Sequence, residues 1–141
     1  MFLKKVKRRK RLNMYLNKKD REKLESMYVD EGIERGGYVN STGVVECKNI
    51  HVNPIENFEL DFKDLDEMCK EDCFATWHVH VNGPSNLTTM DYRSFQNYPE
   101  HYHFIVGKDG LSCYKVNERG VVVIEEIVSD EDESNFQGVL E

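Results

Sequence analysis

Between residues 74 and 91 the sequence reads Phe74-Ala75-Thr76-Trp77-His78-Val79-His80-Val81-Asn82-Gly83-Pro84-Ser85-Asn86-Leu87-Thr88-Thr89-Met90-Asp91. The first seven of these residues have the aromatic and β-branched content of a strand. The Asn-Gly-Pro sequence at 82–84 predicts a turn. Residues 88–96 have the pattern of a helix, which Pro99 would end. The segment is therefore expected to form a strand, a turn and a helix in succession.

Three residues of this segment can hold a metal ion. Alternate side chains of a strand point to the same face, so His78 and His80 are expected to project both imidazoles to one side. After the turn, the chain can return with Asp91 in the first turn of the helix, near both rings. Two imidazoles and one carboxylate suit zinc and leave a fourth position open for water, as in catalytic zinc sites. We therefore predict a zinc site with His78, His80 and Asp91 as ligands.

The rest of the chain alternates between strand-like and helix-like segments. The apolar periodicity predicts helices over 20–31 and 63–70, and strands over 37–39, 44–47, 50–52, 101–106, 111–116 and 121–128. This interleaving indicates a single α/β domain of three layers, with a mixed sheet flanked by helices. We expect a basic N-terminal arm over 1–19, the domain over 20–128 and an acidic tail over 129–141.

Charge is distributed unevenly along the 141 residues, whose formal net charge is -7. The first 23 residues carry a net charge of +9 and the remainder carries -16. A basic arm on an acidic body can bind an acidic protein, an anionic surface or nucleic acid. A solubilising terminus explains the same pattern equally well. No aromatic residue interrupts the cluster from Lys4 to Arg11, so specific nucleic-acid readout is not indicated.

The sequence contains no apolar run long enough to span a bilayer. Its basic start is not followed by the apolar segment of a secretory signal. We therefore expect a cytoplasmic protein, or a component of a virion or tail assembly. The four cysteines are then expected to be reduced thiols.

The spacing of the candidate ligands resembles the motif of the JAMM-type (MPN-fold) zinc metallopeptidases. That motif is an upstream Glu, then His-x-His, seven residues, Ser, two residues and Asp. Here the pair His78-x-His80 is followed by seven residues, Thr88, two residues and Asp91. Thr88 stands where the family has Ser.

The family's upstream Glu lies in a Glu-x-x-Gly element where a helix leads into a strand. Glu34 and Gly37 occupy the equivalent positions here, between the first predicted helix and strand. The resemblance covers residues 20–128, which is most of the chain.

The resemblance implies a three-layer JAMM/MPN fold, whose layout is like that of cytidine deaminases. It also implies hydrolysis of a peptide or isopeptide bond in a protein or peptide substrate by a zinc-activated water. Glu34 would act as general base and Thr88 would donate its hydroxyl to the oxyanion. The small size and short loops are similar to prokaryotic and phage tail-assembly members, which implies a multi-protein assembly.

Other interpretations of the same residues stay open. Thr88-x-x-Asp91 also has the form of a helix capping box, and Glu34 also fits a solvated carboxylate at a helix end. The whole chain could serve as a non-catalytic JAMM-like scaffold or assembly subunit, for example of a phage tail. A zinc deaminase is not indicated, because the chain has no Pro-Cys-x-x-Cys run. The second His-x-His, at His101 and His103, has no Asp at the required distance and is expected to pack or face solvent.

Overall fold

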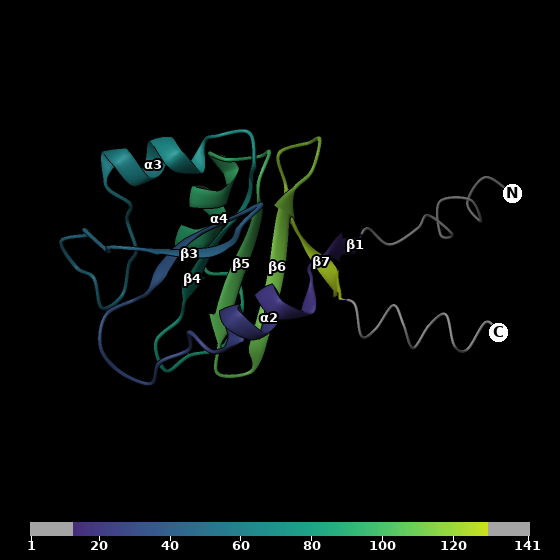
Figure 1. Cartoon of the computed structure of the whole chain (residues 1–141). Coiled ribbons are helices and arrows are strands. Elements are labelled where there is room, and N and C mark those ends of the chain that lie inside the picture. Colours follow the sequence, from purple (N-terminus) through teal and green to yellow (C-terminus); the bar gives the residue numbers. More distant parts are fainter. Residues whose placement is uncertain (1–12, 130–141) are drawn as a thin grey trace, which may run out of the picture.

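A computed structural model describes residues 13–129 of the chain (Figure 1). The basic cluster from Lys4 to Arg11 and the acidic tail from Asp130 onward lie outside the described residues. The elements in chain order are β1 (Asn13–Tyr15), α2 (Lys18–Glu25), β2 (Gly36–Asn40), β3 (Gly43–Cys47), α3 (Phe62–Met68), β4 (Cys73–Val79), α4 (Thr89–Gln96), β5 (Tyr102–Gly107), β6 (Gly110–Val116) and β7 (Val122–Val128).

The seven strands form one curled, mixed sheet in the order β1-β7-β6-β5-β4-β2-β3. Two neighbouring pairs, β1 with β7 and β4 with β5, run parallel, and the other pairs are antiparallel. The expected α/β class with a mixed sheet is therefore confirmed.

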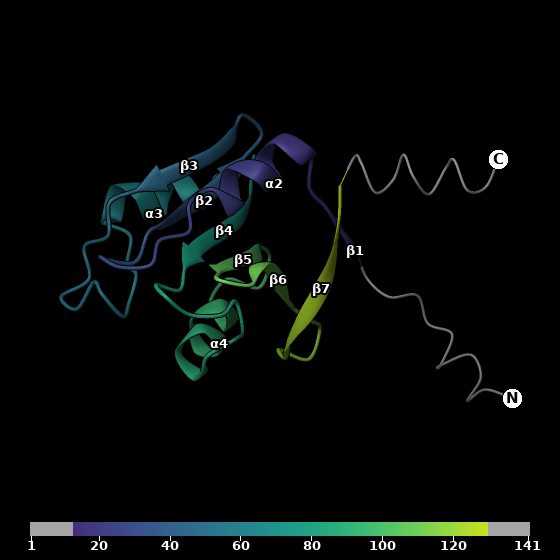
Figure 2. The same ribbon diagram turned by 90° about the horizontal axis from the view of Figure 1, so that it is seen from below.

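Helices cover both faces of the sheet, as Figure 2 shows for α2 and α4. On the α2 side, Leu24 packs in a buried cluster with Trp77 and Phe104. On the other side, Phe95 of α4 packs with Ile105 of β5. This alternation follows from the strand period, because successive residues of β4 and β5 face opposite sides of the sheet. The expected three layers are present.

The β4–α4–β5 unit positions the candidate site. Because β4 and β5 are parallel neighbours, the chain must cross over between them, and α4 lies within this crossover. The loop after β4 returns the chain to the start of α4, so residues at the carboxyl end of β4 lie beside the first turn of that helix. Open α/β sheets commonly bind ligands at this edge.

Two local expectations from the sequence are wrong. The first helix ends at Glu25 rather than at residue 31, because Ser26 caps it and turns the chain. Met27 still reaches the core after this turn, which made the apolar pattern look continuous. The predicted strand over 50–52 is a loop, in which the side chain of Val52 is 97% exposed.

The domain also begins earlier and ends later than the predicted limits of 20 and 128. Within the predicted basic arm, β1 pairs with β7, and Leu16 is buried. At the other end, Ser129 is buried and accepts a hydrogen bond from Arg21. The folded body therefore includes residues 13–19 and Ser129.

No helix within residues 13–129 has the length and apolar character needed to cross a membrane. All four cysteines are free thiols, as expected. Cys69 follows α3 and Cys73 begins β4, so these two residues do not share a helix.

Candidate functional site

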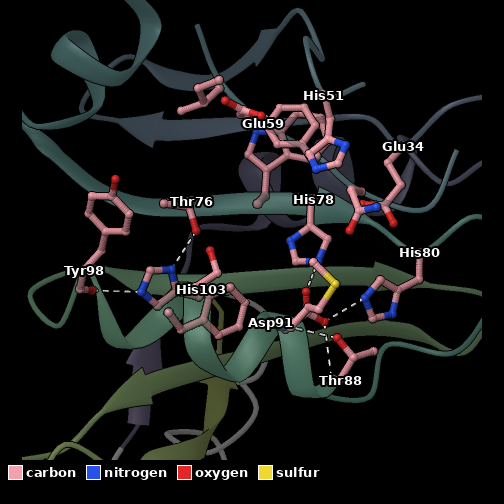
Figure 3. Close-up of a pocket in the computed structure, with 18 of the residues that line it drawn as sticks. Glu34, His51, Glu59, Thr76, His78, His80, Thr88, Asp91, Tyr98 and His103 are labelled. Carbon is pink, nitrogen blue, oxygen red and sulfur yellow. Dashed lines mark hydrogen bonds and ion pairs between the residues drawn. The ribbon is translucent and has the colours of Figure 1, made fainter. Parts of the chain in front are cut away.

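The two histidines and the aspartate that the sequence singles out come together in the structure (Figure 3). The Nε2 atom of His78 lies 3.0 Å from one carboxylate oxygen of Asp91, and Nε2 of His80 lies 2.9 Å from the other. The three ligand atoms lie within 4.8 Å of one another, and within residues 13–129 they are the one such group of His, Cys, Asp or Glu. Two imidazole nitrogens and a carboxylate are a donor set that fits a divalent transition metal such as zinc.

Neighbouring groups fix the orientation of the ligands. The Nδ1–H of His80 donates to the main-chain oxygen of Pro84 at 2.7 Å, which directs Nε2 toward Asp91. This is the usual arrangement of a metal-binding histidine, whose second nitrogen is held by a carbonyl or carboxylate. Burial opposes ionisation of Asp91, but hydrogen bonds from His78 and His80 outweigh it and lower the pKa of that carboxyl. Asp91 is thus an anionic carboxylate at neutral pH, which is the form that could bind a metal.

Thr88 and Asp91 form a helix capping box at the start of α4. The Thr88 hydroxyl accepts a hydrogen bond from the Asp91 main-chain N–H at 3.1 Å, and the Asp91 carboxylate accepts one from the Thr88 N–H at 3.3 Å. The capping interpretation is therefore confirmed, and it is compatible with metal binding by Asp91. Thr88 accepts in this motif, so its own hydroxyl proton can point into the pocket, which Thr88 lines.

Glu34 lies just before β2 and is 7% exposed, so it is not a solvated helix-end carboxylate. It lines the same pocket as His78, His80 and Asp91, and Figure 3 shows it on the same side of the site as the two imidazoles. Burial raises the pKa of the Glu34 carboxyl above its ordinary value, and the nearby His78 and His80 offset that rise only in part. A carboxylate with a raised pKa is a stronger proton acceptor.

The loop of residues 48–61, here named the pocket loop, covers one side of the site. Asn49 organises it: its side-chain N–H groups donate to the main-chain oxygens of Glu34 (2.9 Å), Pro54 (3.2 Å) and Asn57 (2.8 Å). Its side-chain oxygen accepts from the N–H groups of His51 and Glu59. Nothing in the sequence distinguishes Asn49, because an asparagine between a strand and a proline-containing loop is an ordinary turn residue.

A pocket of about 770 Å³ contains the whole candidate site. Residues of the pocket loop line it opposite α4, among them His51, which the sequence analysis also missed. His103, the second histidine of the later His-x-His, lines the pocket too and is 1% exposed. It is packed, as expected, and is not part of the ligand group.

Comparison with known proteins gives a likeness of fold. No protein-family model matches the sequence, and no curated protein matches it. Among solved structures, the chain is similar to the solution structure of protein DSY2949 from Desulfitobacterium hafniense, with a TM-score of 0.62 and 19% sequence identity. The likeness covers 82% of this chain and 92% of that chain. At this identity it shows a shared fold alone, so the chemistry must be argued from the site itself.

Proposed function

We propose that this protein is a JAMM-type zinc metallopeptidase that hydrolyses a peptide or isopeptide bond. The observation that carries the proposal is the convergence of His78, His80 and Asp91 on one point, with the buried Glu34 beside them in one pocket. The motif spacing supports the family, and the mixed sheet flanked by helices is compatible with a three-layer JAMM/MPN fold.

His78, His80 and Asp91 would hold the metal. When bound, zinc would lower the pKa of a water ligand and polarise the scissile carbonyl. The pocket loop and α4 line the pocket around the site, and the side chains of His78, His80 and Asp91 are only 11–15% exposed. This partial shielding from bulk water strengthens the electrostatic interactions among them.

Glu34 would transfer a proton from the attacking water to the leaving amine. Its raised pKa suits a group that takes a proton from the attacking water and then gives it to the leaving amine. Asn49 and Pro54 hold its main chain on both sides, because Asn49 donates to the Glu34 oxygen and the Glu34 N–H donates to the Pro54 oxygen at 2.7 Å. The carboxylate therefore projects from a fixed backbone.

Thr88 would donate its hydroxyl to the carbonyl oxygen as negative charge develops there. Its hydroxyl oxygen is held in place by the Asp91 main-chain N–H. The extra methyl group of Thr restricts χ1 relative to the family's Ser, so the contact is expected to differ in shape while the donor is kept.

The test combines zinc content with hydrolysis. Zinc is measured by mass spectrometry on the wild type, on His78→Ala/His80→Ala and on Glu34→Gln, and each protein is then incubated with a peptide library that is read by mass spectrometry. We expect about one zinc per chain in the wild type and in Glu34→Gln, none in the double variant, and cleavage by the wild type alone. Glu31→Gln, at an exposed position three residues earlier, is the matched control and should cleave normally.

Loss of Glu34 as general base should reduce the rate by roughly 10²–10⁴-fold. Equal cleavage by Glu34→Gln would refute its catalytic role. Absence of zinc from the wild type, even after zinc is supplied, would instead favour the non-catalytic scaffold.

A further inference from the structure

The pocket extends well beyond the candidate metal site. Along β4 it follows Thr76 and His78, which are two residues apart and share a face. Along α4 it follows Asp91, Ser94 and Phe95, which recur at the spacing of one helix face, and it continues to Tyr98 after the helix. The pocket thus runs as a continuous groove from the metal ligands toward α3.

The far part of this groove has apolar walls. We name it the apolar arm and define it by six pocket-lining residues from the pocket loop, α3, α4 and the residues after α4: Phe58, Leu60, Leu65, Met68, Phe95 and Tyr98. Leu60, Leu65 and Tyr98 are half-buried and pack against the buried cluster that contains Met68. The Phe58 ring packs against Gly36, where an added Cβ atom would lie 2.8 Å from the ring. Glycine at this position therefore lets the ring lie against β2.

The polar groups between the metal ligands and the apolar arm bond to one another. The main-chain oxygen of Tyr98 can only accept, so His103 Nε2 carries the hydrogen and donates to it at 2.9 Å. His103 Nδ1 then accepts from the Thr76 hydroxyl at 2.7 Å. Phe95 stacks on the His103 ring with a centroid distance of 4.2 Å. Burial lowers the pKa of His103 to about 4, so this part of the groove is uncharged at neutral pH.

The charged side chains that line the groove are acidic. The ionisable residues that line it are acidic residues, histidines and Tyr98, and no Lys or Arg is among the described lining residues. Glu56 and Glu59 of the pocket loop add to Glu34 and Asp91. A carboxylate placed in the apolar arm, away from the proposed metal, would find no cation among these side chains and would be repelled by the acidic ones.

We propose that the apolar arm is the specificity pocket of the enzyme and binds an aromatic or branched aliphatic side chain next to the scissile amide of a peptide. This inference rests on the proposed metallopeptidase function. The arm is continuous with the metal site, its walls are apolar, and the adjoining side chains of Thr76 and His103 are already hydrogen-bonded. The acidic residues beside the arm also disfavour Asp and Glu in it, and they disfavour a substrate whose free terminal carboxylate lies in the apolar arm.

The first test measures binding without hydrolysis. Acetylated tripeptide amides that differ only in the central residue (phenylalanine, alanine or aspartate) are titrated by NMR into the full-length Glu34→Gln protein with excess zinc. We expect the phenylalanine peptide to bind roughly tenfold more tightly than the alanine peptide, as burial of much of a Phe side chain predicts. The aspartate peptide should bind most weakly. Equal affinity for the phenylalanine and alanine peptides would overturn the proposal.

Substitutions then test whether the preference for the phenylalanine peptide arises in the apolar arm. Leu65→Lys places a cation in the arm and should weaken the phenylalanine peptide severalfold while strengthening the aspartate peptide. Ile124→Lys is the matched control, because Ile124 of β7 is 67% exposed and lies outside the pocket, and it should change neither affinity. Tyr98→Ala provides a second variant of the arm, which tests the proposal if Leu65→Lys does not fold. Peptide affinities unchanged in a folded arm variant would contradict the assignment.

The two proposals can fail separately. Preference for the phenylalanine peptide in a protein that cleaves nothing would support the specificity pocket and reject the peptidase. Cleavage of library peptides with no enrichment of apolar residues beside the cut would reject the specificity pocket and leave the peptidase in place.

Discussion

The side-chain amide of Asn49 donates a hydrogen bond to the main-chain oxygen of Glu34, 2.9 Å away. This contact joins the residue that precedes β2 to the pocket loop that follows β3. Because the same amide also donates to Pro54 and Asn57, one side chain sets both the position of Glu34 and the shape of the loop that faces α4. Glu34, the proposed base, and one wall of the pocket therefore depend on a residue that does not itself line the pocket.

We predict that Asn49→Ala loosens the pocket loop. The change removes up to five hydrogen bonds of mixed quality, and a net loss of about 1 kcal/mol for each good bond suggests a total of roughly 2–3 kcal/mol in unfolding free energy. Chemical denaturation measures this loss. Zinc content should be unchanged, because no ligand is altered, while hydrolysis should fall.

The matched control for Asn49→Ala is Asn86→Ala, at an exposed asparagine in the loop before α4. Its unfolding free energy should stay within about 0.5 kcal/mol of the wild type, as is usual for surface substitutions. An Asn49 variant as stable and as active as this control would show that the pocket loop does not need the amide.

The proposed metal ligands His78, His80 and Asp91 lead to the second prediction. Zinc that binds only the folded state should raise the unfolding free energy of the wild type, by about 4 kcal/mol at a thousandfold excess over its dissociation constant. His80→Ala should lose this zinc-dependent increment, since it removes one of three ligands. Thermal unfolding with zinc and with a chelator measures it.

His101→Ala is the control for the zinc increment, because His101 belongs to the second His-x-His and hydrogen-bonds the main-chain oxygen of Met68 instead. It should lower stability a little with and without zinc and leave the increment intact. The assignment fails if zinc stabilises His80→Ala as much as the wild type.

The parts of the site that the sequence predicts are those encoded by short-range periodicity. His78 lies in β4 and His80 lies one residue past its end, and the two converge because the extended chain, still bonded to β5 at His80, repeats every two residues. Asp91 meets them because a capping box begins the following helix. These features require only the local chain, so the ligand group follows from the segment 74–91. The α/β class follows in the same way from alternating strand-like and helix-like segments.

Features that depend on distant contacts could not be predicted. β1 has three residues next to a basic segment and becomes a strand only because β7 offers an edge. The segment 50–52 has strand-like residues, but Asn49 holds it in a loop through partners up to 15 residues away. The apolar arm combines residues of the pocket loop, α3 and α4 whose proximity no local pattern shows.

Thr88 gives the third prediction, which separates capping from catalysis. Thr88→Ala removes the hydroxyl that accepts from the Asp91 N–H and should lower the unfolding free energy by about 1 kcal/mol. Thr88→Ser should keep that stability and keep hydrolysis, because it restores the donor found in the JAMM motif. Denaturation and peptide cleavage are measured on both variants.

The control for Thr88 is Thr89→Ala, at the exposed first residue of α4. It should keep both stability and hydrolysis. If Thr88→Ala loses stability but cleaves as fast as Thr88→Ser, Thr88 serves as a cap only.

His103 gives the fourth prediction, which concerns stability at acid pH. Burial lowers the pKa of its imidazole from 6.5 to about 4, so below pH 6.5 the unfolded chain binds a proton that the folded protein does not bind. The unfolding free energy should therefore fall as the pH drops from about 6.5 to 4, by roughly 3 kcal/mol from this residue, and this contribution should level off below pH 4. His103→Gln cannot take up that proton and should lack this component.

Denaturation of both proteins across pH 4–7.5, with a chelator present to keep metal out of the comparison, gives the difference directly. Wild-type stability should decline by about 3 kcal/mol relative to the variant across this range, whereas parallel curves would mean that His103 is protonated in the fold as readily as in the unfolded chain.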